Sequence, residues 1–80
     1  MQKVLIYTDG GARGNPGLAG AGIYITDEKG KVLKEIAKPL GVQTNNYAEY
    51  DAVLTALETV KKMLGEKKAK ETLVELRSDS

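Results

Sequence analysis

The sequence of 80 residues contains no cysteine and no histidine. The absence of cysteine excludes a disulfide framework and a cysteine-based zinc site, and the absence of histidine removes the commonest general base and metal ligand. Any catalysis by this chain is therefore expected to depend on carboxylates. Twelve Lys and Arg against eleven Asp and Glu leave a net charge of +1, so affinity for a polyanion would require local placement of charge or bound cations.

The sequence also lacks a long apolar run. No stretch approaches the roughly 18 apolar residues that span a bilayer, and the N-terminal sequence MQKVLIYTDG has no small-residue cleavage site of the kind that ends a signal peptide. These features predict a soluble, cytoplasmic protein that does not bind membranes. The chain has room for one domain at most, residues 1–80, and a chain of this size buries only about 60–65% of its unfolded surface.

Three segments in the first half have the composition of β-strands. Residues 3–8 (KVLIYT) are apolar on both alternating faces, which favours a central strand covered on each side. Residues 19–27 and 31–37 flank the turn sequence DEKG and predict a hairpin, with Pro39 and Gly41 ending the third strand. Three consecutive strands most economically form an antiparallel meander.

The sequence from Thr44 to Gly65 changes to the period of a helix. Its apolar positions form one stripe, which we expect to be the buried face: Tyr50, Val53, Leu54, Leu57 and Leu64. Gly65 is expected to cap the helix, EKKAKE to form a polar connector, and residues 72–77 to form a last short strand. The order predicts an α/β fold, in which the antiparallel meander is followed by one helix and then by a strand parallel to the first.

This topology brings three carboxylates to one edge of the sheet. Asp9 is expected just after the first strand, Glu49 in the first turn of the helix, and Asp79 just after the last strand. Three acids without a neighbouring cation would repel one another and raise each other's pKa values. A hard divalent cation removes this repulsion, and a donor set of oxygen atoms favours Mg²⁺ or Mn²⁺. Such clusters are the usual setting of two-metal phosphodiester chemistry.

Each acid also has a structural alternative. Asp9 precedes glycine, as residues that open turns commonly do, and Asn46 followed three residues later by Glu49 has the spacing of a helix capping box. Asp79 has the alternative of a frayed terminal residue. Asp51, on the same helix as Glu49, serves as a comparison for it. Its position on the helix predicts a solvated side chain, so no role is assigned to it.

Glycine is concentrated in one part of the chain, since six of the nine glycines lie between Gly10 and Gly22. This density indicates a close approach of the backbone to another group, or unusual backbone dihedrals, near the first acid. A phosphate loop of the ATPase type is excluded, because GGARGNPGLAG contains no Gly-Lys-Ser/Thr and precedes no helix.

Three blocks together, YTDGGARGNPGLAGAGI, TNNYAEYDAVLTALE and LRSDS, resemble the type 1 ribonuclease H family in order and spacing. The resemblance implies an endonuclease that cuts the RNA strand of an RNA/DNA hybrid, uses Mg²⁺ held by a carboxylate cluster, and leaves a 5′-phosphate and a 3′-hydroxyl. By the same resemblance, Asp9, Glu49 and Asp79 match the first three catalytic, metal-binding acids of the family.

The resemblance also implies substrate contacts. Asn15, Asn45 and Asn46 would face ribose 2′-hydroxyls and base edges in the minor groove, and Thr44 would hold a DNA phosphate. Three glycines would let main-chain groups approach the RNA ribose, whose 2′-hydroxyl distinguishes RNA from DNA: Gly10, Gly11 and Gly14. Recognition would then depend on the shape of the hybrid and little on its base sequence.

The family's domain continues beyond its third acid with further helices, a strand and a fourth metal-binding acid. We therefore expect residues 1–80 to be an N-terminal part of such a domain, with weak or no turnover of its own and a tendency to form homo-oligomers through exposed apolar surface or strand exchange. Two alternatives remain: a non-catalytic fragment or nucleic-acid-binding module, and a small α/β scaffold whose acids only cap and solvate it.

Overall fold

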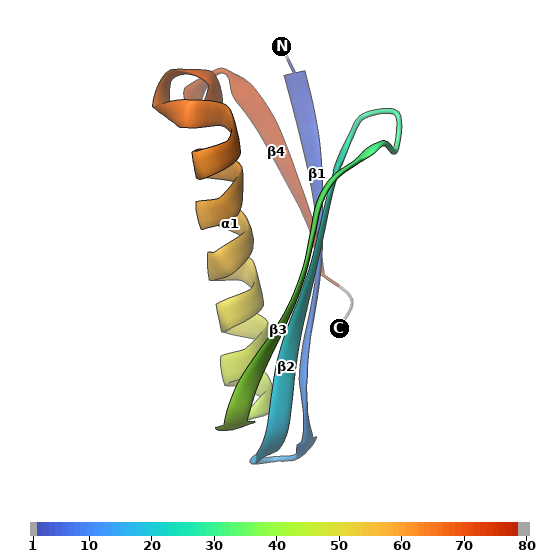
Figure 1. Cartoon of the computed structure of the whole chain (residues 1–80), viewed down its shortest axis with the longest axis vertical. Helices are drawn as coiled ribbons and strands as arrows, with labels where there is room; N and C mark the ends of the chain where they lie inside the picture. Colours follow the sequence, from blue (N-terminus) through green and yellow to red (C-terminus); the bar gives the residue numbers. More distant parts are fainter. Residues whose placement is uncertain (1, 79–80) are drawn as a thin grey trace.

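The computed structural model describes residues 2–78, which form one mixed β-sheet with a single helix lying on one of its faces (Figure 1). The elements in chain order are β1 (Gln2–Gly14), β2 (Gly17–Asp27), β3 (Val32–Gln43), α1 (Asn45–Lys70) and β4 (Thr72–Ser78). The strand order in the sheet is β3-β2-β1-β4. The predicted fold class is confirmed, because β1, β2 and β3 form an antiparallel meander and β4 pairs in parallel with β1.

The hydrophobic core lies between α1 and the sheet. Val4 and Ile6 from β1 and Ile23 and Ile25 from β2 are each at most 5% exposed, and they pack against residues of α1. Alternate residues of a strand share a face, so each strand contributes every second side chain to this layer. Complete burial of a side chain such as Ile6 stabilises the fold by about 1.5–3 kcal/mol.

The helix buries a different face from the predicted stripe. Its buried residues are Ala48, Ala52, Ala56 and Val60, whereas Tyr50, Leu54 and Leu57 are 67%, 42% and 45% exposed. Small alanines allow the helix backbone to lie close to the strands, so the larger side chains are displaced to the outer side. The predicted stripe is therefore confirmed only at Leu64, which packs against the core, because ranking residues by hydrophobicity ignored the space available between the layers.

Two strands extend beyond their predicted ends. β1 continues through the glycines to Gly14 because its ladder with β2 persists, with Asp9 opposite Gly22. β3 continues past Pro39 to Gln43. Pro39 is tolerated because β3 is an edge strand, and the register shifts beside it, leaving Leu40 as the extra residue of a β-bulge.

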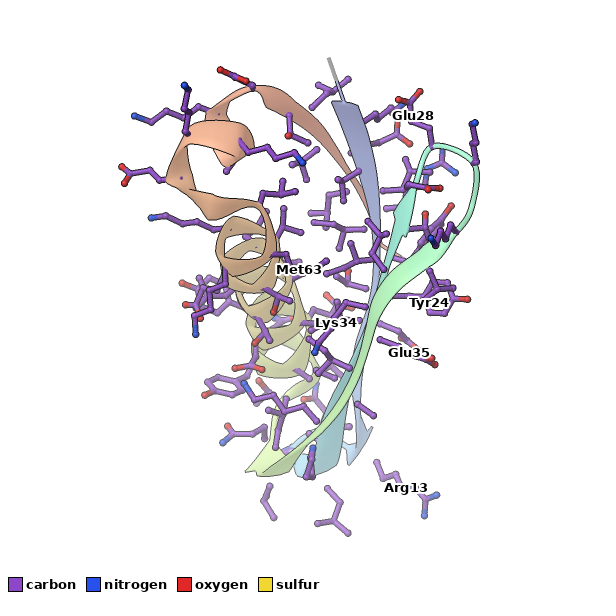
Figure 2. All side chains as sticks on the ribbon, turned by 45° about the horizontal axis from the view of Figure 1, so that its top comes forward. Arg13, Tyr24, Glu28, Lys34, Glu35 and Met63 are labelled. Atoms are coloured by element: carbon purple, nitrogen blue, oxygen red, sulfur yellow. The ribbon has the colours of Figure 1, made fainter. Side chains whose placement is uncertain are left out.

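The sheet face opposite α1 has no covering layer among the described residues (Figure 1). Figure 2 shows Tyr24 and Glu35 directed away from the helix on this side. Tyr7 and Tyr24 are 37% and 39% exposed, and their rings meet edge to face with centroids 6.3 Å apart. The guanidinium of Arg77 lies 5.7 Å from the centre of the Tyr7 ring. β1 is therefore central in the sheet, as predicted, but the described residues cover only one of its faces.

The helix is interrupted at Gly65, where the sequence predicted its end, and continues beyond it. Gly65 has φ 79° and ψ 162°, values outside the helical region, and the helix resumes after this break and reaches Lys70. The segment EKKAKE is therefore mostly helical and was wrongly predicted as a connector. Lysines at positions 67, 68 and 70 lie in the last turn, where they complement the negative end of the helix dipole.

Candidate active site

Asp9 lies within β1 rather than after it. The parallel pairing of β1 with β4 ends at Thr8 opposite Ser78, so Asp9 is the first residue of β1 beyond that pairing. Its side chain is exposed, and its backbone remains paired with Gly22 of β2. Asp79, the third predicted acid, lies outside the described residues.

The backbone of Glu49 lies close to β1 through the packing of α1 on the strand. A Cβ atom built on Gly10 would lie 2.4 Å from the carbonyl oxygen of Ala48 and 2.7 Å from the nitrogen of Glu49. No larger residue fits there without displacing backbone, so Gly10 allows the strand and the helix to meet. Asp9 and Glu49 are consequently carried on two backbone segments that touch beside Gly10.

The electrostatic setting suits a cation. Within residues 2–78, the ion pairs use the carboxylates of Glu75 and Asp51 and do not involve Asp9 or Glu49. Asp9 is exposed and Glu49 is partly buried, so both remain accessible to solvent. The described residues do not include a group of three potential metal ligands. The backbone segments that carry Asp9 and Glu49 are in contact, and both side chains offer the hard oxygen donors that Mg²⁺ prefers.

Two asparagines connect the start of α1 with the β1–β2 hairpin. The Ala12 N–H donates to Asn45 Oδ1 at 2.7 Å, and the Asn45 N–H donates to Asn15 Oδ1 at 3.0 Å. Each side-chain oxygen is thus used within the fold, which leaves the NH₂ group of each amide as the donor for a ligand. The structure therefore brings Asn15 and Asn45 together.

The geometry at the start of α1 shows which residue caps the helix, and so tests whether Asn46 and Glu49 form a capping box. Thr44 is the N-cap, and its Oγ1 accepts from the Tyr47 N–H at 3.1 Å. Asn46 lies inside the helix as its second residue, so the capping-box alternative for Asn46 and Glu49 is wrong. Asn46 is exposed, which leaves it accessible to a ligand.

The glycines near Asp9 differ in what the fold requires of them. Gly14 has φ 85°, a value that disfavours other residues. A Cβ on Gly11 would lie 3.9 Å from Asn45 Oδ1, an ordinary contact distance. Together with Asp9, Gly11 lines a shallow hollow of about 550 Å³ that extends over Gly20 and Gly22. The concentration of glycine in the sequence therefore corresponds to a surface where backbone is exposed beside the first acid.

Asp51 has a structural role that the sequence did not indicate. Its carboxylate lies 3.1 Å from Lys38 Nζ of β3, and its side chain is only 17% exposed. Lys38 Nζ also donates to Thr55 Oγ1 at 3.2 Å. The prediction of a solvated Asp51 was wrong, because the twisted edge strand brings Lys38 against this side of the helix.

The arrangement of a three-stranded meander, a helix crossing behind it, and a fourth strand parallel to the first, with acids on β1 and α1, defines a ribonuclease H-like fold. The chain belongs to the ribonuclease H family, whose model (RNase H) matches residues 1–80. The predicted family membership is thus confirmed.

Relatives and solved structures agree with this assignment. A ribonuclease H of Ruthia magnifica subsp. Calyptogena magnifica is 43% identical over 61 residues, which are 76% of this chain and 40% of that protein. LC11-RNase H1, isolated from compost by a metagenomic approach, is 55% identical with a TM-score of 0.90, and the match covers 100% of this chain and 56% of that one. A structure of LC11-RNase H1 in complex with an RNA/DNA hybrid is 52% identical with a TM-score of 0.83, over 96% of this chain and 54% of that one.

The chain therefore spans about half the length of the solved relatives that it matches. In the part of the chain that the structure describes, no helix has the length and apolar character needed to cross a membrane.

Proposed function

We propose that this chain carries the first metal-binding acids and part of the substrate surface of a ribonuclease H, an endonuclease that hydrolyses the RNA strand of RNA/DNA hybrids. The observation that carries this proposal is the contact at Gly10, which brings the segments bearing Asp9 and Glu49 together. Membership in the family and the hybrid bound by LC11-RNase H1 support the substrate class. Residues 1–80 are proposed to act as part of one such domain.

Asp9, Glu49 and Asp79 are the residues that would hold Mg²⁺, with Mn²⁺ as a substitute. Their oxygen-only donor set fits a hard cation, and neither Asp9 nor Glu49 is committed to an ion pair within the described residues. A bound ion of this kind supplies charge neutralisation of the phosphate and lowers the pKa of a coordinated water. The protein contributes the close contact between β1 and α1 at Gly10, which joins the backbone segments bearing Asp9 and Glu49.

Recognition of the hybrid is proposed to use the hairpin end of β1 and the start of α1. The side-chain oxygens of Asn15 and Asn45 are occupied by main-chain N–H groups, so their NH₂ groups are oriented donors for 2′-hydroxyl oxygens and minor-groove acceptors. Exposed backbone at Gly11 permits a ribose to approach closely. Thr44 keeps its hydroxyl oxygen on the Tyr47 N–H and can still donate its proton to a phosphate oxygen.

The test combines metal binding with cleavage. Mg²⁺ titrated by calorimetry is expected to bind the unmodified chain, and Asp9→Asn or Glu49→Gln is expected to weaken binding by about tenfold or more. Glu58→Gln is the matched control, because Glu58 is an exposed acid on the same helix. A labelled RNA/DNA hybrid at high protein concentration is expected to show slow cleavage that Asp9→Asn abolishes.

The outcomes separate the alternatives. Hybrid binding without carboxylate-dependent Mg²⁺ uptake would support a non-catalytic nucleic-acid-binding module. If the Glu49→Gln variant bound both Mg²⁺ and hybrid as the unmodified chain does, the acids would only be structural and the proposal would be rejected.

A further inference from the structure

Arg13 belongs to the glycine-rich segment, but the proposed function does not yet use it. It is the only charged residue in the sequence from Gly10 to Thr26, and residues 39–48, which lead into α1, contain none. These two segments include the hairpin end and the start of the helix, the surface proposed to receive the hybrid. Because the net charge of the chain is only +1, contact with a polyanion depends on where single cations are placed.

Arg13 lies on the same face of β1 as Asp9. β1 pairs with β2 in unbroken register up to the hairpin, so residues 9, 11 and 13 point to one side of the sheet. Figure 2 shows Arg13 at the hairpin end, on the side of the sheet that carries Tyr24 and away from α1. Asp9, Gly11 and Arg13 therefore form a row along one side of β1.

The guanidinium of Arg13 is available to a ligand. Arg13 is exposed, and the ion pairs within residues 2–78 do not involve it. Lys38, a second cation beside the hollow at Asp9, is instead held by the Asp51 carboxylate at 3.1 Å. The cationic group at this end of the molecule that can meet an anion is therefore Arg13.

The hairpin fixes the backbone at Arg13. Gly14 has φ 85°, and a Cβ atom on Gly17 would overlap the carbonyl oxygen of Arg13. Gly14 and Gly17 pair with each other and close the hairpin directly after Arg13. The Arg13 backbone is thus held in relation to Asp9 by the strand ladder, which reduces the entropy lost when a ligand binds.

The spacing along β1 shows which part of a substrate Arg13 can meet. Four residues of a strand span about 13 Å, so a phosphate bound by Arg13 differs from the phosphate at the metal site of Asp9. A guanidinium offers parallel N–H donors that match two phosphate oxygens. The row therefore combines a metal-binding acid, exposed backbone at Gly11 and a phosphate-binding cation.

We propose that Arg13 binds a backbone phosphate of the RNA strand, on the hairpin side of the bond that is cleaved. This inference rests on the proposed function, since Asp9 and Gly11 in the same row are assigned to the RNA strand. The contact is independent of base sequence, and it sets the position of the strand along β1.

The experiment measures the salt dependence of binding to a labelled RNA/DNA hybrid by fluorescence anisotropy, in Mg²⁺ and over times too short for cleavage. In Arg13→Gln, the slope of log K against log salt concentration is expected to become shallower by about 1. The Kd at low salt is expected to rise by about threefold to tenfold. Arg13→Lys is expected to keep the slope but to bind less tightly than the unmodified chain, because lysine lacks the planar fork.

Lys29→Gln is the matched control. It removes the same charge from an exposed residue in the β2–β3 turn, at the other end of the sheet (Figure 1), and is expected to leave the slope unchanged. Circular dichroism establishes that each variant is folded. An unchanged slope in Arg13→Gln, or equal changes in Arg13→Gln and Lys29→Gln, would overturn the inference and leave the proposed function intact. Absence of hybrid binding by the unmodified chain would reject the proposed function and this inference with it.

A second measurement identifies the strand. Hybrids carry one neutral methylphosphonate at a time, in the RNA strand beside a 2′-deoxyribose or in the DNA strand. The same 2′-deoxyribose beside an ordinary phosphate is the control. One position in the RNA strand is expected to weaken binding by the unmodified chain without weakening binding by Arg13→Gln further. If that position lay in the DNA strand, the assignment to the RNA strand would be wrong.

Discussion

At the scale of single residues, Gly10 is the position on which the candidate active site depends most. The acids on either side of this contact attract attention in the sequence, but the contact between their backbone segments depends on a residue without a side chain. A Cβ atom at Gly10 would lie 2.4 Å from the Ala48 oxygen, which is closer than real side chains approach. The identity of this residue is therefore a requirement of packing between β1 and α1.

Gly10→Ala is expected to destabilise the fold by about 1–3 kcal/mol, because the added methyl group pushes the start of α1 away from β1. The control is Gly11→Ala, whose Cβ would meet only Asn45 Oδ1 at 3.9 Å. This neighbouring change is expected to be neutral or to stabilise by about 0.4–1 kcal/mol. Urea denaturation measures both values. Equal effects of the two substitutions would contradict the close-approach explanation.

Glu75 provides a test of electrostatics at the same scale. Its pKa lies below the usual value, first because Lys3 donates a hydrogen bond to its carboxylate and then because Arg77 does. Since the pKa is lowered in the folded state, the stabilisation is present above the unfolded pKa and is lost as the pH falls through the folded pKa. At neutral pH, the melting temperature of the unmodified chain is expected to be slightly higher than that of the Glu75→Gln variant.

The two melting temperatures are expected to converge in acid, and thermal melts across the pH range measure the difference. The effect is small because the pair is exposed to solvent. A difference between the two proteins that stays constant with pH would show that Glu75 acts through packing alone.

At the scale of elements, the relation between α1 and the sheet depends on small residues. Ala48, Ala52 and Ala56 are fully buried, and the ion pair between Lys38 and Asp51 holds the edge strand to the same helix. The exposed Leu54 and Leu57 face away from this contact. The helix is thus positioned by close backbone packing and one partly buried ion pair.

Ala52→Leu is expected to destabilise the chain by about 1–3 kcal/mol, because the larger side chain has no space between the layers. Leu54→Ala replaces a large side chain by a small one on the exposed side of the helix. It is expected to change the free energy of unfolding by about 0.5 kcal/mol or less. The free energy of unfolding from denaturant titration distinguishes them. A larger loss from Leu54→Ala would mean that the stripe first predicted from the sequence is buried after all.

At the scale of the whole molecule, the two sheet faces are unequal. One is packed against α1, and the other presents Tyr7, Tyr24 and Leu73, which are 37%, 39% and 52% exposed. Exposed aromatic and aliphatic side chains on a sheet face without a covering layer favour association with another surface. We propose that the isolated chain of 80 residues forms homo-oligomers through this face.

Sedimentation velocity is expected to show a mass that rises with protein concentration. Tyr24→Lys places a charge on the open face and is expected to shift the chain towards the monomer, whereas Leu54→Lys on the outer side of α1 is expected to leave association unchanged. A monomer at all concentrations with a cooperative melt would contradict association through the sheet.

Much of the fold could be predicted from the sequence because the signals were local. The strand-like composition of residues 19–27, the turn DEKG and the helical period after Thr44 each depend on neighbours in the chain. The Asp27 turn formed as expected, with the Gly30 N–H donating to the Asp27 carbonyl at 3.1 Å. The errors concerned features set by distant partners. β1 extends because β2 pairs with it, and β3 passes Pro39 because it lies at an edge.

The sequence by itself determined the order of elements and the family, because composition and residue spacing carry that information without a third dimension. The dependence on carboxylates stays a prediction. Only the tertiary structure decided which helix face is buried, that Gly10 joins β1 to α1 beside Asp9 and Glu49, and that Asp51 is held by Lys38. The physical reason is the separation of the contacting residues along the chain. These contacts join residues far apart in the chain, and their energies depend on space and partners that exist only after the sheet and the helix have packed together.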